Sequence, residues 1–218
     1  MIICHRGFWN NISDQNTESS FYKAFKKKFG IETDIRDCNG KVVISHDMPT
    51  GKEIELTNLL KLHIFNNTKV NLLLNIKSDG LHSKLLEIMN EFPRIEFYCF
   101  DMSVPDMKIY ADLKIPFLTR LSDYEKDLCF ISEAKGIWLD AFNNDWYSKR
   151  TINKFLKMDK LVYIVSSECH NRPYKKCWQR LKKMDLPWSS KKIFLCTDFP
   201  EEAHNFFSIK DEKIKDYT

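Results

Sequence analysis

Short apolar runs alternate with amphipathic stretches along almost the whole chain. The clearest run is VNLLLNI at 70–76, which is almost wholly apolar, as in a strand buried on both faces of a parallel sheet. A helical or helix-like segment follows each run. The runs begin at Ile2, Ile31, Val70, Glu96, Ile115, Gly136, Leu161 and Lys192. Eight such units with short links predict a compact α/β fold, a (β/α)8 or TIM barrel, as one domain over residues 1–218.

The segments between these runs predict helices. In the first, Phe21, Ala24, Phe25 and Phe29 recur at helical spacing, Asn16 or Thr17 can cap the start, and Gly30 ends it. Further helices are expected in the connector 48–62 and over 81–92, 104–113, 148–158, 174–184 and 200–207, with a short helical turn around 124–131. The pair Asn39-Gly40 predicts a tight hairpin inside 31–47.

Composition narrows the class of protein. The chain is 43% hydrophobic and 29% charged with a net charge of +4, which is ordinary for a soluble globular protein. Its lysine clusters are typical of solvated helix faces, and the absence of a nucleic-acid motif argues against such a partner. Seven scattered cysteines without a CxxC pair indicate a reduced, cytoplasmic setting. No signal peptide and no transmembrane segment are expected, and the oligomeric state stays open.

Residues suited to catalysis gather in the first 47 positions. His5 and His46 each follow an apolar run, where a strand meets a loop. Glu32 and Asp34 share one face of a strand, because successive side chains alternate. Two acids on one face repel each other unless a cation or a base lies between them. Since the strand ends of a parallel barrel meet at one rim, we expect these side chains to lie together.

Six short motifs are spread over almost the whole chain. They are His5-Arg6-Gly7, Asn16-Thr17, Glu32-Thr33-Asp34, Gly40 with Val42-Val43 and His46-Asp47, Asn75-Ile76-Lys77, and Thr197-Asp198-Phe199-Pro200. In this set the chain resembles the glycerophosphodiester phosphodiesterase family, barrel enzymes related to the phosphatidylinositol-specific phospholipases. The resemblance implies a hydrolase that cleaves a glycerophosphodiester or a similar small or lipid-derived phosphodiester.

The resemblance also implies roles for individual residues. His5 and His46 would be the general acid and base, Glu32 and Asp34 would bind a divalent cation, and Arg6 and Lys77 would contact the phosphate. These residue types suit the chemistry, which needs two groups that titrate near neutrality and positive charge on the phosphoryl oxygens. A hard cation such as Mg²⁺ or Ca²⁺ prefers oxygen ligands. Arg120 and Trp138 fall near strand ends and are further candidate substrate contacts.

Asn75 departs from the family pattern, which carries a glutamate there as a further metal ligand. Its amide oxygen could still bind a cation, or the residue could be a buried amide bonded to neighbours; the sequence leaves both open. The acids could instead form ion pairs with Arg36 or Lys77. His63, His82, His170 and His204 show no ligand-like spacing and are expected in surface or helix positions.

Two alternatives to a hydrolase follow. A barrel whose metal site has lapsed would bind a phosphate ligand without cleaving it. A lyase of the phospholipase D toxin type would let a substrate hydroxyl attack and would release a cyclic phosphate. The sequence does not separate attack by water from attack by a hydroxyl.

Overall fold

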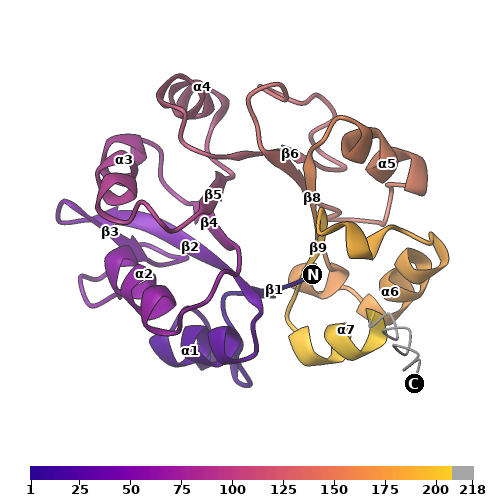
Figure 1. Ribbon diagram of the computed structural model, residues 1–218, viewed down its shortest axis with the longest axis horizontal. Coiled ribbons are helices and arrows are strands. Elements are labelled where there is room, and N and C mark those ends of the chain that lie inside the picture. Colours follow the sequence, from indigo (N-terminus) through magenta and orange to yellow (C-terminus); the bar gives the residue numbers. More distant parts are fainter. Residues whose placement is uncertain (208–218) are drawn as a thin grey trace, which may run out of the picture.

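Eight parallel strands curve into a nearly closed barrel in the computed structural model, which describes residues 1–207 (Figure 1). The strands are β1 (Ile2–His5), β2 (Gly30–Cys38), β4 (Leu72–Ile76), β5 (Phe97–Phe100), β6 (Leu118–Leu121), β7 (Gly136–Leu139), β8 (Leu161–Val165) and β9 (Ile193–Thr197). Their order is β5-β4-β2-β1-β9-β8-β7-β6, and β3 (Lys41–Ile44) pairs antiparallel with β2. The predicted single-domain α/β barrel is confirmed, and positions 208–218 of the predicted domain lie outside the described residues.

Seven helices surround the strands in the described part of the chain (Figure 1). They are α1 (Glu18–Lys26), α2 (Leu56–Phe65), α3 (His82–Glu91), α4 (Val104–Leu113), α5 (Lys149–Lys157), α6 (Tyr174–Lys183) and α7 (Pro200–Phe207). Thr17 caps α1. Its hydroxyl accepts a hydrogen bond from the backbone amide of Ser20, and the Ser20 hydroxyl accepts one from the backbone amide of Thr17. No helix within residues 1–207 is both long and apolar enough to cross a membrane. The cytoplasmic setting stays a prediction.

The prediction of a helical turn around 124–131 is wrong, because the connection between β6 and β7 consists of turns and bends. At its start the Ser122 hydroxyl accepts the amides of Tyr124 and Glu125, which holds the backbone in a turn. Further on, Phe130 has a φ of 50°, in the left-handed region. Leu128, Phe130 and neighbouring residues still pack against the core, so this loop covers the barrel where an eighth helix was expected.

Two strands begin at least two residues later than their apolar runs suggested, β4 at Leu72 and β6 at Leu118. At β6 the cause is the end of α4. Lys114 adopts a left-handed conformation with a φ of 59°, and the amide of Ile115 donates to the carbonyl of Tyr110. Ile115 is therefore a buried residue that closes the helix.

Side chains that point into the barrel form a core of their own. Tyr163 stacks on Phe194 with ring centroids 4.4 Å apart, and Phe100 stacks on Trp138 at 4.1 Å. The larger apolar core between strands and helices lies on the outer face of the same strands. Because the barrel interior is filled, a cavity inside the ring of strands lies above this filled core, at the end where the strands finish.

The barrel has a seam between β5 and β6. A single bridge joins Cys99 to Phe117 there, whereas every other neighbouring pair of parallel strands has three to five paired residues. An ion pair also crosses the seam, with the Arg120 guanidinium 3.0 Å from the Asp101 carboxylate. The ring of strands is thus closed mainly by side chains at this point.

Candidate active site

A cavity of about 300 Å³ opens at the carboxyl end of the barrel. All nine residues that the sequence singled out line it: His5, Arg6, Glu32, Asp34, His46, Asn75, Lys77, Arg120 and Trp138. Strand register explains part of this grouping. His5 on β1 lies opposite Glu32 on β2, and Asp34 lies opposite Asn75 on β4. The structure therefore brings the candidate residues to one site, while their roles stay predictions.

His5 is held by a carboxylate that the sequence did not single out as a site residue. Its Nδ1 lies 2.7 Å from Oδ1 of Asp198, which follows β9, and its Nε2 lies 4.0 Å from Glu32. Burial lowers the pKa of His5, but Cys169, the hydrogen bond to Asp198 and the charge of Glu32 together raise it well above its usual value. The Asp198 carboxylate thus positions the imidazole and favours its protonated form.

The turn after β1 explains the His-Arg-Gly motif. Arg6 has a φ of 57°, and its amide donates to the Glu32 carboxylate at 3.2 Å. Gly7 has a φ of 87°, and a Cβ there would lie 2.3 Å from the Ser20 hydroxyl. Only glycine fits this turn, which presses the loop against α1 and directs the Arg6 side chain toward Asp34.

Glu32 and Asp34 are both almost fully buried, at 1% exposed each, but they titrate differently. Burial, followed by the charge of Asp34, raises the pKa of Glu32 to about 7. Burial also acts on Asp34, yet Lys77 and Arg6 outweigh it and lower the pKa. Their nitrogens lie 3.2 and 3.0 Å from its carboxylate, and Asn16 donates a further hydrogen bond at 2.9 Å. The predicted alternative pairing with Lys77 thus occurs, whereas Arg36 donates to the His46 carbonyl.

Asn75 is 8% exposed and lines the cavity. Within the described residues its Oδ1 atom has no hydrogen-bond partner. A buried amide oxygen without a partner lowers the stability of the fold. The sequence had left open that this amide is hydrogen-bonded to its neighbours, and for Oδ1 the structure of residues 1–207 does not show such a bond. Together with Glu32 and Asp34 it presents three oxygen-bearing side chains, the donor type that Mg²⁺ and Ca²⁺ prefer.

His46 lies at the more open side of the cavity. Its side chain is 46% exposed, and its Nδ1 lies 2.9 Å from the carboxylate of the adjacent Asp47, which is itself exposed. It is therefore less restrained than His5. It lies after β3, whereas His5 ends β1, so the two histidines reach the cavity from different strands.

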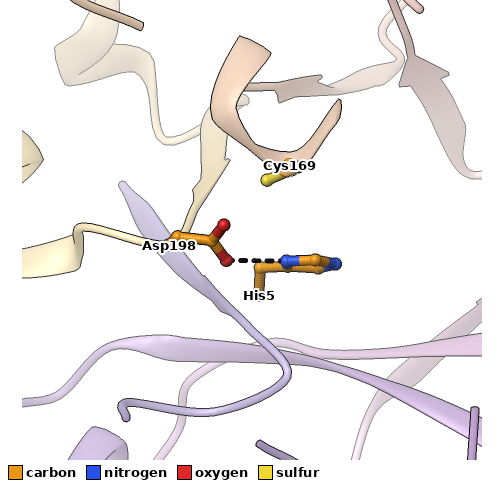
Figure 2. A group of neighbouring side chains, drawn as sticks. All are labelled: His5, Cys169 and Asp198. Atoms are coloured by element: carbon orange, nitrogen blue, oxygen red, sulfur yellow. Dashed lines mark hydrogen bonds and ion pairs between the residues drawn. The ribbon is translucent and has the colours of Figure 1, made fainter. Parts of the chain in front are cut away.

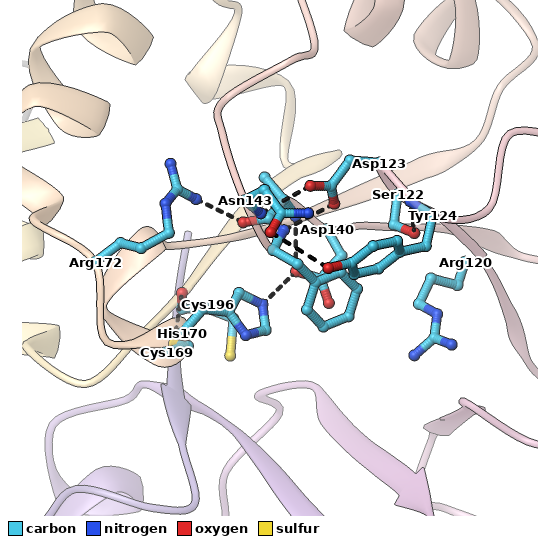
Figure 3. A network of polar contacts seen from close by, with 12 residues as sticks. Arg120, Ser122, Asp123, Tyr124, Asp140, Asn143, Cys169, His170, Arg172 and Cys196 are labelled. Carbon is cyan, nitrogen blue, oxygen red and sulfur yellow. Dashed lines mark hydrogen bonds and ion pairs between the residues drawn. The ribbon is translucent and has the colours of Figure 1, made fainter.

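The wall formed by β5 to β8 contains residues that the sequence did not single out (Figure 3). His170 lies 2.6 Å from the Asp140 carboxylate and packs against Phe142, with ring centroids 4.5 Å apart. The sequence predicted a surface or helix position for His170 and no role in the site. The structure places it at the end of a short helix on the cavity wall. Asp140 directly follows β7, and this position at a strand end could have identified it.

Arg120 and Trp138 lie on that same wall, in different settings. Arg120 is paired with Asp101 and Glu125, so its charge is already shared between two carboxylates. Burial raises the pKa of Asp101 to about 6, although Arg120 and Lys77 oppose the rise. Trp138 is 4% exposed and stacked on Phe100, so it forms part of the cavity floor.

Comparison with known proteins supports the fold. No family model and no curated protein sequence matches the chain. A glycerophosphodiester phosphodiesterase from Agrobacterium tumefaciens is 14% identical with a TM-score of 0.62, over 92% of this chain and 96% of that one. A phosphodiesterase from Oleispira antarctica, solved in complex with the product sn-glycerol-3-phosphate, is 13% identical with a TM-score of 0.67, over 94% and 95%. The predicted resemblance to this group is thus confirmed at the level of the fold.

Proposed function

We propose that this protein is a phosphodiesterase that hydrolyses a glycerophosphodiester or a similar small or lipid-derived phosphodiester. One observation carries the proposal: a single cavity is lined by His5, which is itself paired with Asp198, by two buried acids and by the cations of Arg6 and Lys77. Cleavage of a phosphodiester needs proton transfer and charge neutralisation at one place. The fold likeness to two phosphodiesterases supports the same reading.

Glu32, Asp34 and Asn75 would hold a divalent cation, with Mg²⁺ or Ca²⁺ the best match to oxygen ligands. The unpartnered Oδ1 of Asn75 supports this assignment, because a cation would satisfy it. Such a cation, when bound, supplies positive charge to the phosphoryl oxygens. Arg6 and Lys77 add to this charge, since both lie within 3.2 Å of Asp34 and line the same cavity.

His5 is the better candidate for the general acid. Asp198 holds its Nδ1, so its Nε2 is left to donate a proton, and its raised pKa keeps that proton in place at neutral pH. His46 would accept a proton from the nucleophile at the open side of the cavity. That nucleophile is water in a hydrolase and a substrate hydroxyl in a cyclising lyase.

The direct test is hydrolysis of a panel of glycerophosphodiesters and model diesters with Mg²⁺, Ca²⁺ or Mn²⁺. His5→Ala and His46→Ala are expected to abolish turnover. His82→Ala is the control, because His82 lies outside the cavity lining and pairs with Asp106 instead. A wild-type protein that is inert with every metal and diester would overturn the proposal.

The same panel separates the alternatives. Phosphorus NMR distinguishes a monoester product from a cyclic phosphate, so it identifies a lyase. Calorimetry that detects a bound diester without turnover or metal dependence would indicate the non-catalytic phosphate-binding barrel.

A further inference from the structure

A second group of potential ligands lies beside the acids of β2, and it has a different chemical character. His5, Cys169 and Asp198 each offer one ligand atom, and these three atoms lie within 4.8 Å of one another (Figure 2). Among residues 1–207 no other group of three or more histidine, cysteine or acidic side chains meets this criterion. His5 and Cys169 line the cavity, which gives a cation a route to the group.

Hydrogen bonds hold in place the three separate elements that carry these side chains. Cys169 lies in the short helix η2 (Ser167–His170), and its sulfur lies 3.8 Å from the carbonyl oxygen of Cys196 on β9. In η2, Glu168 accepts hydrogen bonds from the Thr197 hydroxyl and the Asp198 amide. At the end of β1, the Trp9 indole donates to the His5 carbonyl at 2.9 Å. The contacts of His5 and Asp198 are made by their backbones, so they fix the backbone positions from which these side chains project. The Cys169 thiol exchanges its contact with the Cys196 carbonyl for the bond to the metal when it loses its proton.

We propose that His5, Cys169 and Asp198 form a binding site for Zn²⁺ or another thiophilic divalent cation. Nitrogen, thiolate and carboxylate are the ligands that zinc prefers, whereas Mg²⁺ and Ca²⁺ prefer oxygen alone. Three protein ligands leave a fourth position for water on the cavity side, as in open zinc sites. The cavity would thus have two cation sites that differ in ligand chemistry.

The geometry requires only small side-chain movements. Two ligand atoms on a tetrahedral zinc ion are roughly 3.3 to 3.7 Å apart, as follows from the Zn–N, Zn–O and Zn–S bond lengths. The 2.7 Å separation of His5 and Asp198 would widen, and separations of up to 4.8 Å would shorten. Binding displaces the proton that His5 shares with Asp198 and the proton of the Cys169 thiol, and both leave to solvent. No oxidation or reduction is involved.

One consequence rests on the proposed function. A cation on Nδ1 of His5 takes the place of the proton shared with Asp198. The ring is then no longer an imidazolium, so its Nε2 proton becomes much harder to donate to a leaving group. Thiophilic cations would therefore inhibit a diesterase that Mg²⁺ or Ca²⁺ supports, and raising the concentration of the hard cation would not fully reverse the inhibition.

The test uses Co²⁺ as a spectroscopic probe for zinc. We expect the wild-type protein to bind one Co²⁺ with visible absorption of tetrahedral intensity and a thiolate-to-cobalt band in the near ultraviolet, both lost on addition of Zn²⁺. Cys169→Ser should lose the thiolate band and weaken binding by more than about 100-fold, because even outer contacts of metal sites contribute about 10- to 100-fold. Asp198→Asn should also weaken binding while it preserves side-chain size.

The control is Cys38→Ser, because Cys38 is also partly buried but lies outside the cavity lining. It should leave the spectrum unchanged. Weak octahedral absorption alone, or a thiolate band that survives in Cys169→Ser, would overturn the proposal. The spectra are independent of turnover, so an inert protein that still shows the band refutes the phosphodiesterase and not the zinc site. For an active protein, zinc inhibition is measured against each variant's own rate.

Discussion

The pairing of Asp198 with His5 can be tested by a substitution that preserves shape. Asp198→Asn keeps the side-chain size but removes the charge that lies 2.7 Å from Nδ1. The two side chains are only 14% and 17% exposed, so water screens the interaction weakly. A hydrogen bond to a charged group contributes roughly 1.5 to 3 kcal/mol. Since about 1.4 kcal/mol corresponds to a tenfold change in rate, we expect kcat/KM for an alkyl diester to fall about 10- to 150-fold.

The pH profile gives a second readout of the same change. Burial opposes a high pKa at His5, and the hydrogen bond to Asp198 is one of the contacts that raise it. The pKa of His5 in the variant should therefore fall. A general acid must be protonated to act, so activity is lost as the pH rises through its pKa. The alkaline limb of the kcat/KM profile should accordingly move to lower pH in Asp198→Asn.

The choice of substrate makes the test specific for proton donation. A p-nitrophenolate leaving group needs no proton, whereas an alkoxide does, so the loss should be much smaller for a p-nitrophenyl diester. Asp145→Asn is a matched control, because it disrupts a 2.8 Å pair with Arg172 at a similar exposure outside the cavity lining. Equal losses on both substrates, or an alkaline limb that does not move, would refute the role of His5 as the general acid.

Three further changes follow from the structure. Asn75→Asp should tighten the binding of Mg²⁺ or Ca²⁺, because it adds a negative charge to a ligand, and Asn75→Leu should weaken it, because it removes the oxygen. Calorimetry measures both affinities, and unchanged values would exclude Asn75 as a ligand. His170→Ala leaves the buried Asp140 without its 2.6 Å partner and should raise KM more than it lowers kcat, and a loss confined to kcat would contradict a role in substrate binding. Gly136→Ala should lower the free energy of unfolding in urea by about 1–3 kcal/mol, because the new Cβ would lie 2.4 Å from the Leu161 carbonyl; unchanged stability would show that β7 and β8 can separate freely.

Features of the chain that depend on local sequence were predictable. The apolar run at 70–76 contains β4, and Asn39 and Gly40 adopt φ values of 49° and 78° in the predicted hairpin. Alternation along β2 correctly placed Glu32 and Asp34 on one face. These predictions succeeded because side-chain periodicity and turn preferences act over a few residues.

Features that depend on barrel closure were not predictable from such patterns. Asp198 reaches His5 across 193 positions, and His170 reaches Asp140 across 30. Which strand ends face one another depends on the strand order and register of the whole sheet. The prediction of a helix at 124–131 failed for a related reason. The apolar residues of this segment do pack on the core, but they do so from a loop, which the apolar pattern alone does not distinguish from a helix.

The seam between β5 and β6 bears on how the molecule could be redesigned. The sheet closes there through one backbone bridge and the Arg120–Asp101 ion pair. Opening the barrel at this seam would therefore break few hydrogen bonds. Among the parallel strands, hydrogen exchange should therefore be fastest at the amides of β5 and β6 that face each other, and Arg120→Met should accelerate it further. Moving the chain termini to this seam by circular permutation would cut the barrel where it is joined least. The permuted chain would keep the β9-β1-β2-β4 half of the wall, which contains Asp198, His5, Glu32 and Asn75, in one uninterrupted sheet.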